Sequence, residues 1–130
     1  MKILVCGGRD FFNKKLLYHT LDNLCEEFNL KTEPDEYGNW LPKDVVIIHG
    51  KAAGADTLAG DWAIINWTEF EEYPADWQTH GRAAGPIRNQ QMLDEGKPDL
   101  VLAFPTERSR GTWDMVRRAT KAGVPVRVIK

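Results

Sequence analysis

A pair of glycines follows the first apolar run of the sequence, and at this position glycine is suited to binding a phosphate group. Gly7 and Gly8 come directly after the run Ile3–Cys6. Glycine has no Cβ, so backbone N–H groups can approach a phosphate closely, and the N-terminus of a following helix adds partial positive charge. The full G-x-G-x-x-G pattern is missing. The pair alone therefore indicates a tight turn as readily as a nucleotide site.

Arginines add positive charge to the same part of the sequence pattern. Their guanidinium groups match phosphate oxygens with two parallel hydrogen bonds. We predict that five arginines approach one edge of the fold: Arg9, Arg82, Arg88, Arg108 and Arg110. Arg9, Arg88 and Arg110 are expected to bind the ligand because each stands in a glycine-rich or helix-start context. Gly111 and Thr112 offer free N–H groups and a hydroxyl. We predict that three further arginines are solvated surface charges: Arg117, Arg118 and Arg127.

Carboxylates and an aromatic ring complete the set of residues that could do chemistry. Three carboxylates belong to this set: Asp10, Asp56 and Asp76. They would bind ribose hydroxyls, act as a general base, or have a structural role such as capping a helix. For the fold, Asp10 would cap the first helix or pair with Arg9, and Asp56 would cap the second helix. Trp77 would stack on a base or plug the core.

The elements that must position these residues alternate between strands and helices. Apolar runs predict strands at 3–6, 44–49, 68–73, 99–104 and 125–129. Helical spacing predicts helices at 13–28, 55–66, 86–95 and 112–122, with Gly96 as the C′ residue of the third and Gly123 ending the fourth. This order predicts a Rossmann-like, three-layer α/β fold: a mostly parallel five-stranded sheet with helices on both faces.

Four loops follow the carboxyl ends of the predicted strands, at 7–10, 49–56, 73–77 and 105–112. Such loops gather at one edge of an open α/β sheet, where ligands bind at the point of strand-order reversal. We therefore expect a composite site at this edge, with these ligand-binding residues: Gly7, Gly8, Arg9, Asp10, His49, Gly50, Gly54, Asp56, Asp76, Trp77, Arg88, Asn89, Arg110, Gly111 and Thr112.

Several predictions concern packing. Asn13 is expected to cap the first helix, whose buried stripe runs to Phe28. Trp62 and Trp67 are expected in the core. Residues 30–43 are polar with proline and glycine, and predict a surface loop or short hairpin pinned by Trp40 and Leu41. The 130 residues otherwise suit one domain, 1–130.

Composition limits the class of protein. The chain is 42% hydrophobic and 28% charged, with a formal net charge of −2, which argues against a nucleic-acid partner. No apolar run is long enough to cross a membrane and the N-terminus reads as a strand rather than a signal peptide, so we expect a cytoplasmic protein. Cys6 and Cys25 form no C-x-x-C pair, and His19, His49 and His80 are widely separated. We therefore expect no metal site and no cofactor.

Five motifs in order carry a resemblance to a known family: Gly7–Phe11, His49–Asp56, Pro74–Trp77, Gly81–Gln90 and Arg110–Thr112. Together they resemble the YspA (cpYpsA-related) branch of the SLOG superfamily, across nearly the whole chain except 30–43. The superfamily also contains the LOG phosphoribohydrolases and the Rossmann domain of DNA-processing protein A, and members of the branch occur in bacteria and phages. The resemblance implies a Rossmann-like fold that binds nucleotide-derived ligands, related to NAD or ADP-ribose, and it also implies self-association into a homo-oligomer.

One departure from the LOG pattern concerns catalysis. LOG enzymes carry Pro-Gly-Gly-x-Gly-Thr-x-x-Glu, in which glycines hold phosphate and the glutamate serves catalysis. Here Gly111 and Thr112 match, but Met115 stands at the glutamate position and Asp114 lies one residue early. One residue is about 100° of helix rotation, so we expect Asp114 to point elsewhere. The LOG arginine corresponds to Arg88.

Three functions compete at this point. The first is a domain that binds or senses a phosphate-bearing, nucleotide-derived small molecule. The second is a nucleotide N-glycosidic hydrolase with Asp10, Asp56 or Asp114 as acid or base. The third, by analogy with DNA-processing protein A, is a DNA-associated protein, which the net charge disfavours.

Overall fold

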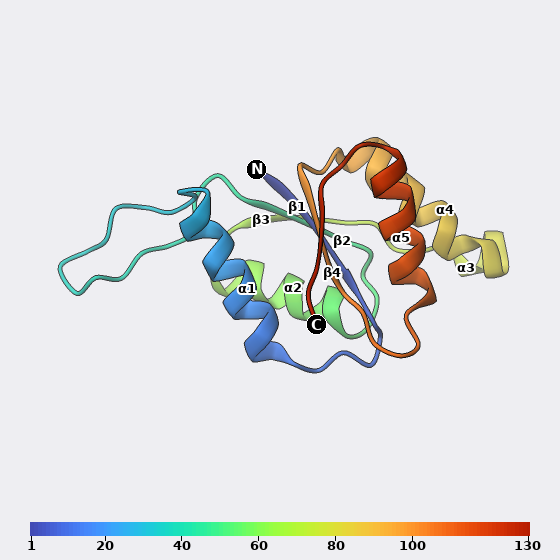
Figure 1. Ribbon diagram of the computed structural model, residues 1–130, viewed down its shortest axis with the longest axis horizontal. Coiled ribbons are helices and arrows are strands. Elements are labelled where there is room, and N and C mark those ends of the chain that lie inside the picture. Colours follow the sequence, from blue (N-terminus) through green and yellow to red (C-terminus); the bar gives the residue numbers. More distant parts are fainter.

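The computed structural model describes all residues from 1 to 130, which form a five-stranded sheet with helices on both faces (Figure 1). Every neighbouring pair of strands is parallel, in the order β3-β2-β1-β4-β5. The strands are β1 (Lys2–Gly7), β2 (Val46–His49), β3 (Glu69–Glu72), β4 (Leu100–Phe104) and β5 (Val126–Val128). The predicted Rossmann-like, three-layer α/β class is therefore confirmed.

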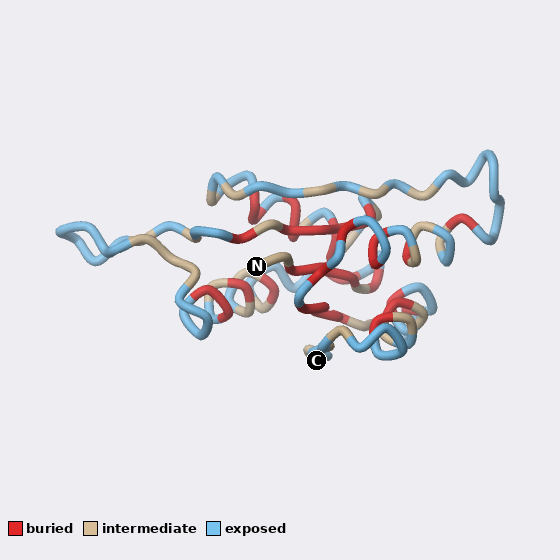
Figure 2. Tube along the Cα trace, turned by 90° about the horizontal axis from the view of Figure 1, so that it is seen from above, coloured by how far each residue is buried: buried red, intermediate tan, exposed pale blue.

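The helices connect the strands and cover the sheet. They are α1 (Lys14–Glu27), α2 (Ala55–Ile65), α3 (Trp77–His80), α4 (Ala84–Gln91) and α5 (Arg110–Lys121), with a 3₁₀ turn η1 (Gly81–Ala83) and a π-helical turn η2 (Met92–Gly96). In Figure 2 the buried segments lie in the interior, between the exposed outer surfaces of the helices. The longest helix, α1, has 14 residues, and none of the helices combines the length and the apolar character needed to cross a membrane.

The side chains of β1 alternate between the two faces of the sheet, so this strand contributes to two hydrophobic clusters. Ile3 and Val5 point to the face covered by α1 and α2, and pack in a cluster of 16 buried residues. Leu4 and Cys6 point to the opposite face, in a cluster of nine buried residues that includes Met115 of α5. Successive strand side chains alternate between faces, so a continuous apolar run is what a strand covered on both sides requires.

The position of β1 also determines where a ligand can bind. β1 is the central strand: the chain moves outward from it to β2 and β3 on one side, and then crosses to β4 and β5 on the other. The carboxyl ends of β1 and β4 therefore flank the point where strand order reverses. Open α/β sheets bind ligands at this point.

The first helix follows the prediction except at its end. Asn13 is the N-cap, and its Oδ1 accepts a hydrogen bond of 3.1 Å from the N–H of Leu16. Leu17 and Leu21 are completely buried. Phe28, predicted to complete the buried stripe, is 42% exposed because the helix has ended at Glu27 and the ring lies beneath the guanidinium of Arg127.

The connection after β3 is more helical than the sequence predicted. The sequence predicted a loop that includes Trp77, but α3 begins at this residue. Asp76 Oδ1 accepts a hydrogen bond from Thr79 N and so caps the helical turn. The helix predicted to begin near Pro86 begins at Ala84 and ends in the π-helical turn η2. Gly96 is part of that turn, and Lys97 instead takes the left-handed conformation with φ of 50°.

Residues 30–43 form a protrusion that extends away from the sheet (Figure 1). Its two arms meet at a single antiparallel bridge between Lys31 and Pro42, and its tip closes on Asp35, as predicted for a short hairpin. Trp40 packs against the core, as expected. Leu41 does not, since it is half exposed and alternates to the outer side of the arm.

Two tryptophans at the end of α2 differ in a way the sequence did not predict. Trp62 is buried, and its Nε1 donates a 3.0 Å hydrogen bond to Asp22. Trp67, also predicted to be in the core, is 89% exposed. It follows the end of the helix with φ of 60°, and this left-handed turn carries its side chain out of the buried stripe.

Trp67→Asn is expected to stabilise the fold by about 0.5–1 kcal/mol, because asparagine tolerates the left-handed conformation and almost no buried surface is lost. Urea unfolding followed by circular dichroism measures the change. Trp62→Phe is the control and must destabilise, since it removes the bond to Asp22. A destabilised Trp67→Asn variant would contradict the assignment of Trp67 as a free surface residue.

Candidate functional site

A cleft of about 990 Å³ opens at the carboxyl ends of β1 and β4. Its walls come from the β1–α1 turn, the start of α2, the stretch from α3 to α4, and the β4–α5 loop with the first turns of α5. Six arginines line it: Arg9, Arg82, Arg88, Arg108, Arg110 and Arg117. Four carboxylates oppose them: Asp10, Asp56, Glu107 and Asp114. The cleft is therefore locally cationic although the chain carries a net charge of −2.

Most of the residues predicted from the sequence do line this cleft: Gly7, Gly8, Arg9, Asp10, Asp56, Trp77, Arg88, Asn89, Arg110, Gly111 and Thr112, and also the catalytic candidate Asp114. Four predicted residues lie outside its lining: His49, Gly50, Gly54 and Asp76.

Three of the four residues outside the cleft, His49, Gly50 and Asp76, make contacts within the fold. His49 is buried at the end of β2, where its Nδ1 accepts the N–H of Lys51 and its ring stacks on Phe70. Burial lowers the pKa of this imidazole, which disfavours the cation. Gly50 leaves room for the guanidinium of Arg88, and Asp76 caps α3. These internal contacts account for a glycine, a histidine and an aspartate at the three positions.

The glycine at the end of β1 is required by packing. A Cβ on Gly7 would lie 2.5 Å from the Cβ of Ala55 and 2.7 Å from the carbonyl oxygen of Phe104. β1 can therefore approach α2 and β4 this closely only with glycine at position 7. A Cβ on Gly8 would collide with the side chain of Thr106, so both glycines allow the walls of the cleft to meet.

Asp10 joins two walls of the cleft. Its Oδ1 accepts a 2.5 Å hydrogen bond from the hydroxyl of Thr106, which in turn contacts the hydroxyl of Ser109 at 2.9 Å. The carboxylate neither caps α1, since Asn13 does so, nor pairs with Arg9. Its structural role is to tie the β1–α1 turn to the β4–α5 loop.

Arg9 and Trp77 form a pair at the mouth of the cleft. The guanidinium carbon lies 5.4 Å from the centre of the indole ring, within the range of a cation–π contact. Trp77 is 49% exposed, so it does not plug the core. A half-exposed indole beside an arginine offers an aromatic surface and a positive charge to the same ligand.

Asp56 is the buried carboxylate of the cleft, with 5% of its surface exposed. Its Oδ2 accepts hydrogen bonds from Gly50 N at 2.9 Å and Ala52 N at 3.3 Å, so it holds the turn that precedes α2. Burial raises its pKa to about 6, although the two N–H groups and the nearby charge of Arg88 act in the opposite direction. A carboxyl that titrates near neutrality in a cleft is a candidate general acid.

Arg88 and Asn89 fasten α4 to its neighbours. Arg88 Nη1 donates to the carbonyl of Gly50 at 2.5 Å, and its Nε donates to Asn89 Oδ1 at 3.1 Å. Asn89 Nδ2 donates to the carbonyl of Gly111 and to Asp114 Oδ2. Both polar ends of the Asn89 amide are therefore occupied, whereas Nη2 of Arg88 makes no hydrogen bond and remains available to a ligand.

The N-terminus of α5 contains the unpartnered group of the cleft. Thr112 is 3% exposed, and its Oγ1 has no hydrogen-bond partner. It lies in the first turn of a 12-residue helix whose N-cap, Ser109, makes no side-chain capping bond. The first N–H groups of a helix have no intrahelical acceptor, so this end of α5 presents several donors to the cleft.

The structure places several residues differently from the prediction, and two of them, Arg117 and Cys6, line the cleft. Arg117, predicted as a solvated charge, lines the cleft because it lies two turns from Arg110 on the same side of α5. Arg118 pairs with Asp114, and Arg127 pairs with Glu27, so neither is simply solvated. Cys6 lines the cleft as a buried thiol whose pKa is raised by burial. Helical spacing from Arg110 was the signal that would have placed Arg117.

Comparison with known proteins assigns the chain to a family. The model of the YspA, cpYpsA-related SLOG family matches residues 1–80. The Gene 61 protein of Mycobacterium phage D29 is 43% identical over 133 residues, covering 96% of this chain and 93% of that protein. No solved structure matches the chain. The family resemblance predicted from the motifs is confirmed, and the phage relative fits the expected source in bacteria or phages.

Asp56→Asn is expected to stabilise the protein at pH 8 by as much as about 3 kcal/mol and to have little effect at pH 4. Between the ordinary pKa of 3.8 and the raised value of about 6, the folded carboxyl keeps a proton that the unfolded chain releases. Stability is therefore lost as the pH rises through this range. Both hydrogen bonds end on one oxygen, so the asparagine carbonyl can keep them.

Urea unfolding from pH 4 to pH 8 measures this difference, with Asp61→Asn as the control because Asp61 is an exposed carboxylate on the same helix. A loss of stability in Asp56→Asn that grows as the pH rises would show that the ionised carboxylate stabilises the fold, and it would contradict this expectation.

Proposed function

The chain belongs to the YspA, cpYpsA-related SLOG family, and from this premise we propose that its cleft binds a nucleotide-derived small molecule through a phosphate group. The ligand class is a nucleoside phosphate or a compound related to NAD or ADP-ribose. The proposal makes this protein a binding or sensing domain rather than a dedicated catalyst.

The observation that carries the proposal is the unpartnered hydroxyl of Thr112. A buried hydroxyl without a partner costs free energy, so proteins seldom keep one unless another molecule satisfies it. Here it stands at the N-terminus of α5 and lines the cleft. Helix N-termini favour anions through their free N–H groups and the helix dipole. A phosphate oxygen would satisfy the hydroxyl and the helix end together.

The charge of the cleft supports the same ligand. Six arginines against four carboxylates leave an excess of guanidinium groups. Arg110 stands in the same first turn of α5 as Thr112, and Arg88 keeps Nη2 free. Guanidinium groups bind phosphate bidentately, so these groups suit a ligand with more than one phosphate oxygen to offer.

The rest of the cleft supports a ligand larger than a phosphate. Its volume of about 990 Å³ is at the upper end of the usual range for small-molecule sites. The half-exposed indole of Trp77 lines it, together with Gly85 and Pro86 of α4. An aromatic surface and an anion site in one cleft match the base and the phosphate of a nucleotide.

The groups at the α5 end favour binding over hydrolysis. Met115, at the position of the catalytic glutamate in LOG enzymes, is completely buried in the core. Asp114 lines the cleft, but its Oδ2 is engaged by Asn89 Nδ2 at 3.0 Å and by Arg118 Nε at 2.8 Å. Neither residue presents a free carboxylate comparable to that glutamate.

One observation favours a second candidate function, cleavage of the N-glycosidic bond of a nucleotide. Asp56 lines the cleft and its pKa is raised to about 6, so a fraction of the carboxyl keeps its proton near neutral pH. A protonated carboxyl can act as a general acid toward a departing base. Asp56 would supply this acid from α2. In LOG enzymes the catalytic glutamate stands instead at the position that Met115 of α5 occupies here.

Thr112→Val is expected to affect ligand binding and stability in opposite directions. Removing the unpartnered hydroxyl should raise stability by about 1 kcal/mol, while loss of one donor should weaken phosphate-ligand binding about tenfold. Calorimetric titration with AMP, NAD and ADP-ribose measures affinity, and thermal unfolding measures stability. Thr120→Val is the control, since Thr120 is exposed on the same helix and its hydroxyl bonds within it. Binding of none of these compounds would contradict the proposal.

On the hydrolase alternative, release of free base from nucleoside monophosphates should fall as the pH rises above about 6 and should be abolished in Asp56→Asn. Chromatography of the released base at high enzyme concentration is the measurement. Activity that survives Asp56→Asn but is lost in Asp114→Asn would transfer the acid role to α5, and absence of turnover in the unaltered protein would remove this alternative.

A further inference from the structure

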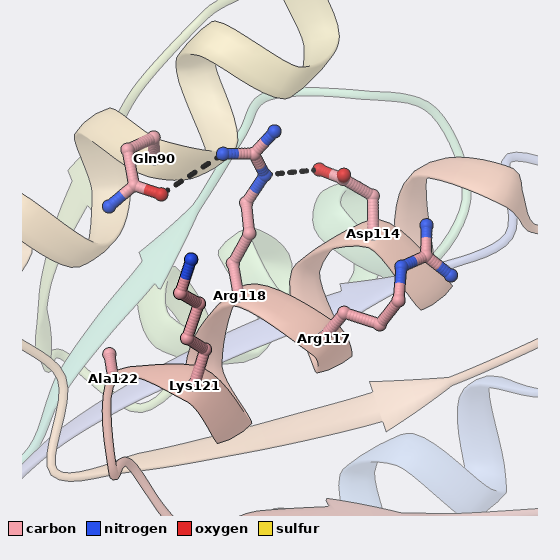
Figure 3. A pocket seen from close by; sticks show the side chains of 6 residues that line it. All are labelled: Gln90, Asp114, Arg117, Arg118, Lys121 and Ala122. Carbon is pink, nitrogen blue, oxygen red and sulfur yellow. Dashed lines mark hydrogen bonds and ion pairs between the residues drawn. The ribbon is translucent and has the colours of Figure 1, made fainter.

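A second hollow, which shares Asp114 and Arg117 with the cleft, lies between α4 and α5 and has a volume of about 560 Å³ (Figure 3). Six residues line it: Gln90, Asp114, Arg117, Arg118, Lys121 and Ala122. Three of these side chains are cationic and one is a carboxylate. The hollow therefore has an excess of positive charge that its own lining does not neutralise.

The single carboxylate is shared among several donors. Asp114 Oδ2 accepts from Arg118 Nε at 2.8 Å and also from Asn89 Nδ2 at 3.0 Å. Arg118 Nη1 donates to Gln90 Oε1 at 3.0 Å, so this guanidinium is held in one orientation across the gap between the helices (Figure 3). Its Nη2 makes no hydrogen bond. A fixed guanidinium with a free N–H edge is prepared for an anion.

The neighbouring cations have no partners. Lys121 makes no ion pair, and its side chain extends from the next turn of α5 toward the Gln90–Arg118 pair (Figure 3). Arg117 makes no ion pair either, and it lines both the hollow and the cleft. Asp94 of η2 accepts a hydrogen bond from Gln90 Nε2 rather than from a cation.

The helix dipole accounts for part of this arrangement only. Cations in the last turn of a helix are favoured by its partial negative charge, and Arg118 and Lys121 lie there. The dipole requires no partner on α4, whereas Gln90 fixes Arg118 against that helix. Asp114, Arg118 and Lys121 lie at i, i+4 and i+7, which places them on one side of α5 toward the hollow.

We propose that this hollow is a second anion site, which takes a free phosphate ion between Lys121 and the Nη2 edge of Arg118. The site does not depend on the proposed ligand of the cleft. It is connected to the cleft through Asp114, which lines both. A phosphate on the Nη2 edge shares the positive charge of Arg118 with Asp114, and it leaves that carboxylate less neutralised at the wall of the cleft. Occupancy of the hollow therefore opposes phosphate binding in the cleft.

Titration of the ¹⁵N-labelled protein with inorganic phosphate, followed by NMR, separates the two sites. The amides of Lys121 and Ala122 and the side-chain amide of Gln90 report on the hollow, and the amides of Gly8 and Gly111 report on the cleft. We expect saturable shifts at the hollow reporters. Lys121→Gln should raise the dissociation constant for phosphate at the hollow about fivefold. Because the hollow is then less occupied, phosphate should bind more tightly in the cleft.

Lys97→Gln is the matched control, because Lys97 is an exposed lysine outside both linings. Arg110→Gln lies in the cleft alone, so it should weaken the cleft reporters and not the hollow reporters. Shifts of the hollow reporters that rise linearly without saturating, or that Lys97→Gln reduces as much as Lys121→Gln does, would overturn the proposal. Absence of binding at Gly8 and Gly111 with saturation at Lys121 would instead contradict the cleft function and leave the hollow site standing.

Discussion

The cleft depends on a close approach between the end of β1 and its two neighbours. A side chain at Gly7 would overlap both Ala55 of α2 and the Phe104 carbonyl of β4. Gly54, with φ of 80°, completes the contact, since a Cβ there would collide with the carbonyl of Gly8. The glycines that the sequence associates with phosphate are thus occupied in bringing chain segments together. They form walls of the cleft, which the N-terminus of α5 and six arginines also line.

The fold was largely predictable because strands buried on both faces and amphipathic helices follow from apolar spacing alone. The stretch after β3 was not predictable, because its structure depends on one short-range hydrogen bond from Thr79 N to Asp76 and on a π-helical turn. Trp67 was misplaced for a related reason. Its exposure is determined by the backbone conformation of one residue beyond the helix, and composition carries no information about that angle.

The site was predicted less completely than the fold. Loops at the carboxyl edge of the sheet could be identified from the order of elements, so Arg9, Thr112 and their neighbours were placed correctly beside the cleft. The sequence could not separate residues that face the cleft from those that support it. His49 and Asp76 lie at or after the carboxyl ends of strands, as the cleft-lining residues do, yet one is packed against Phe70 and the other caps a helix. Only side-chain direction distinguishes these cases.

Side-chain direction on α5 also separates binding from catalysis. Met115 faces the sheet and is enclosed by Leu4, Cys6 and other core residues, so a carboxylate at this position would require the core to rearrange. Asp114, one residue earlier, is turned to the side of the helix, where Asn89 and Arg118 hold it. This rotation gives α5 the donors for an anion without a free carboxylate beside them. Among the carboxyls that line the cleft, Asp56 of α2 is the one whose pKa burial raises, to about 6.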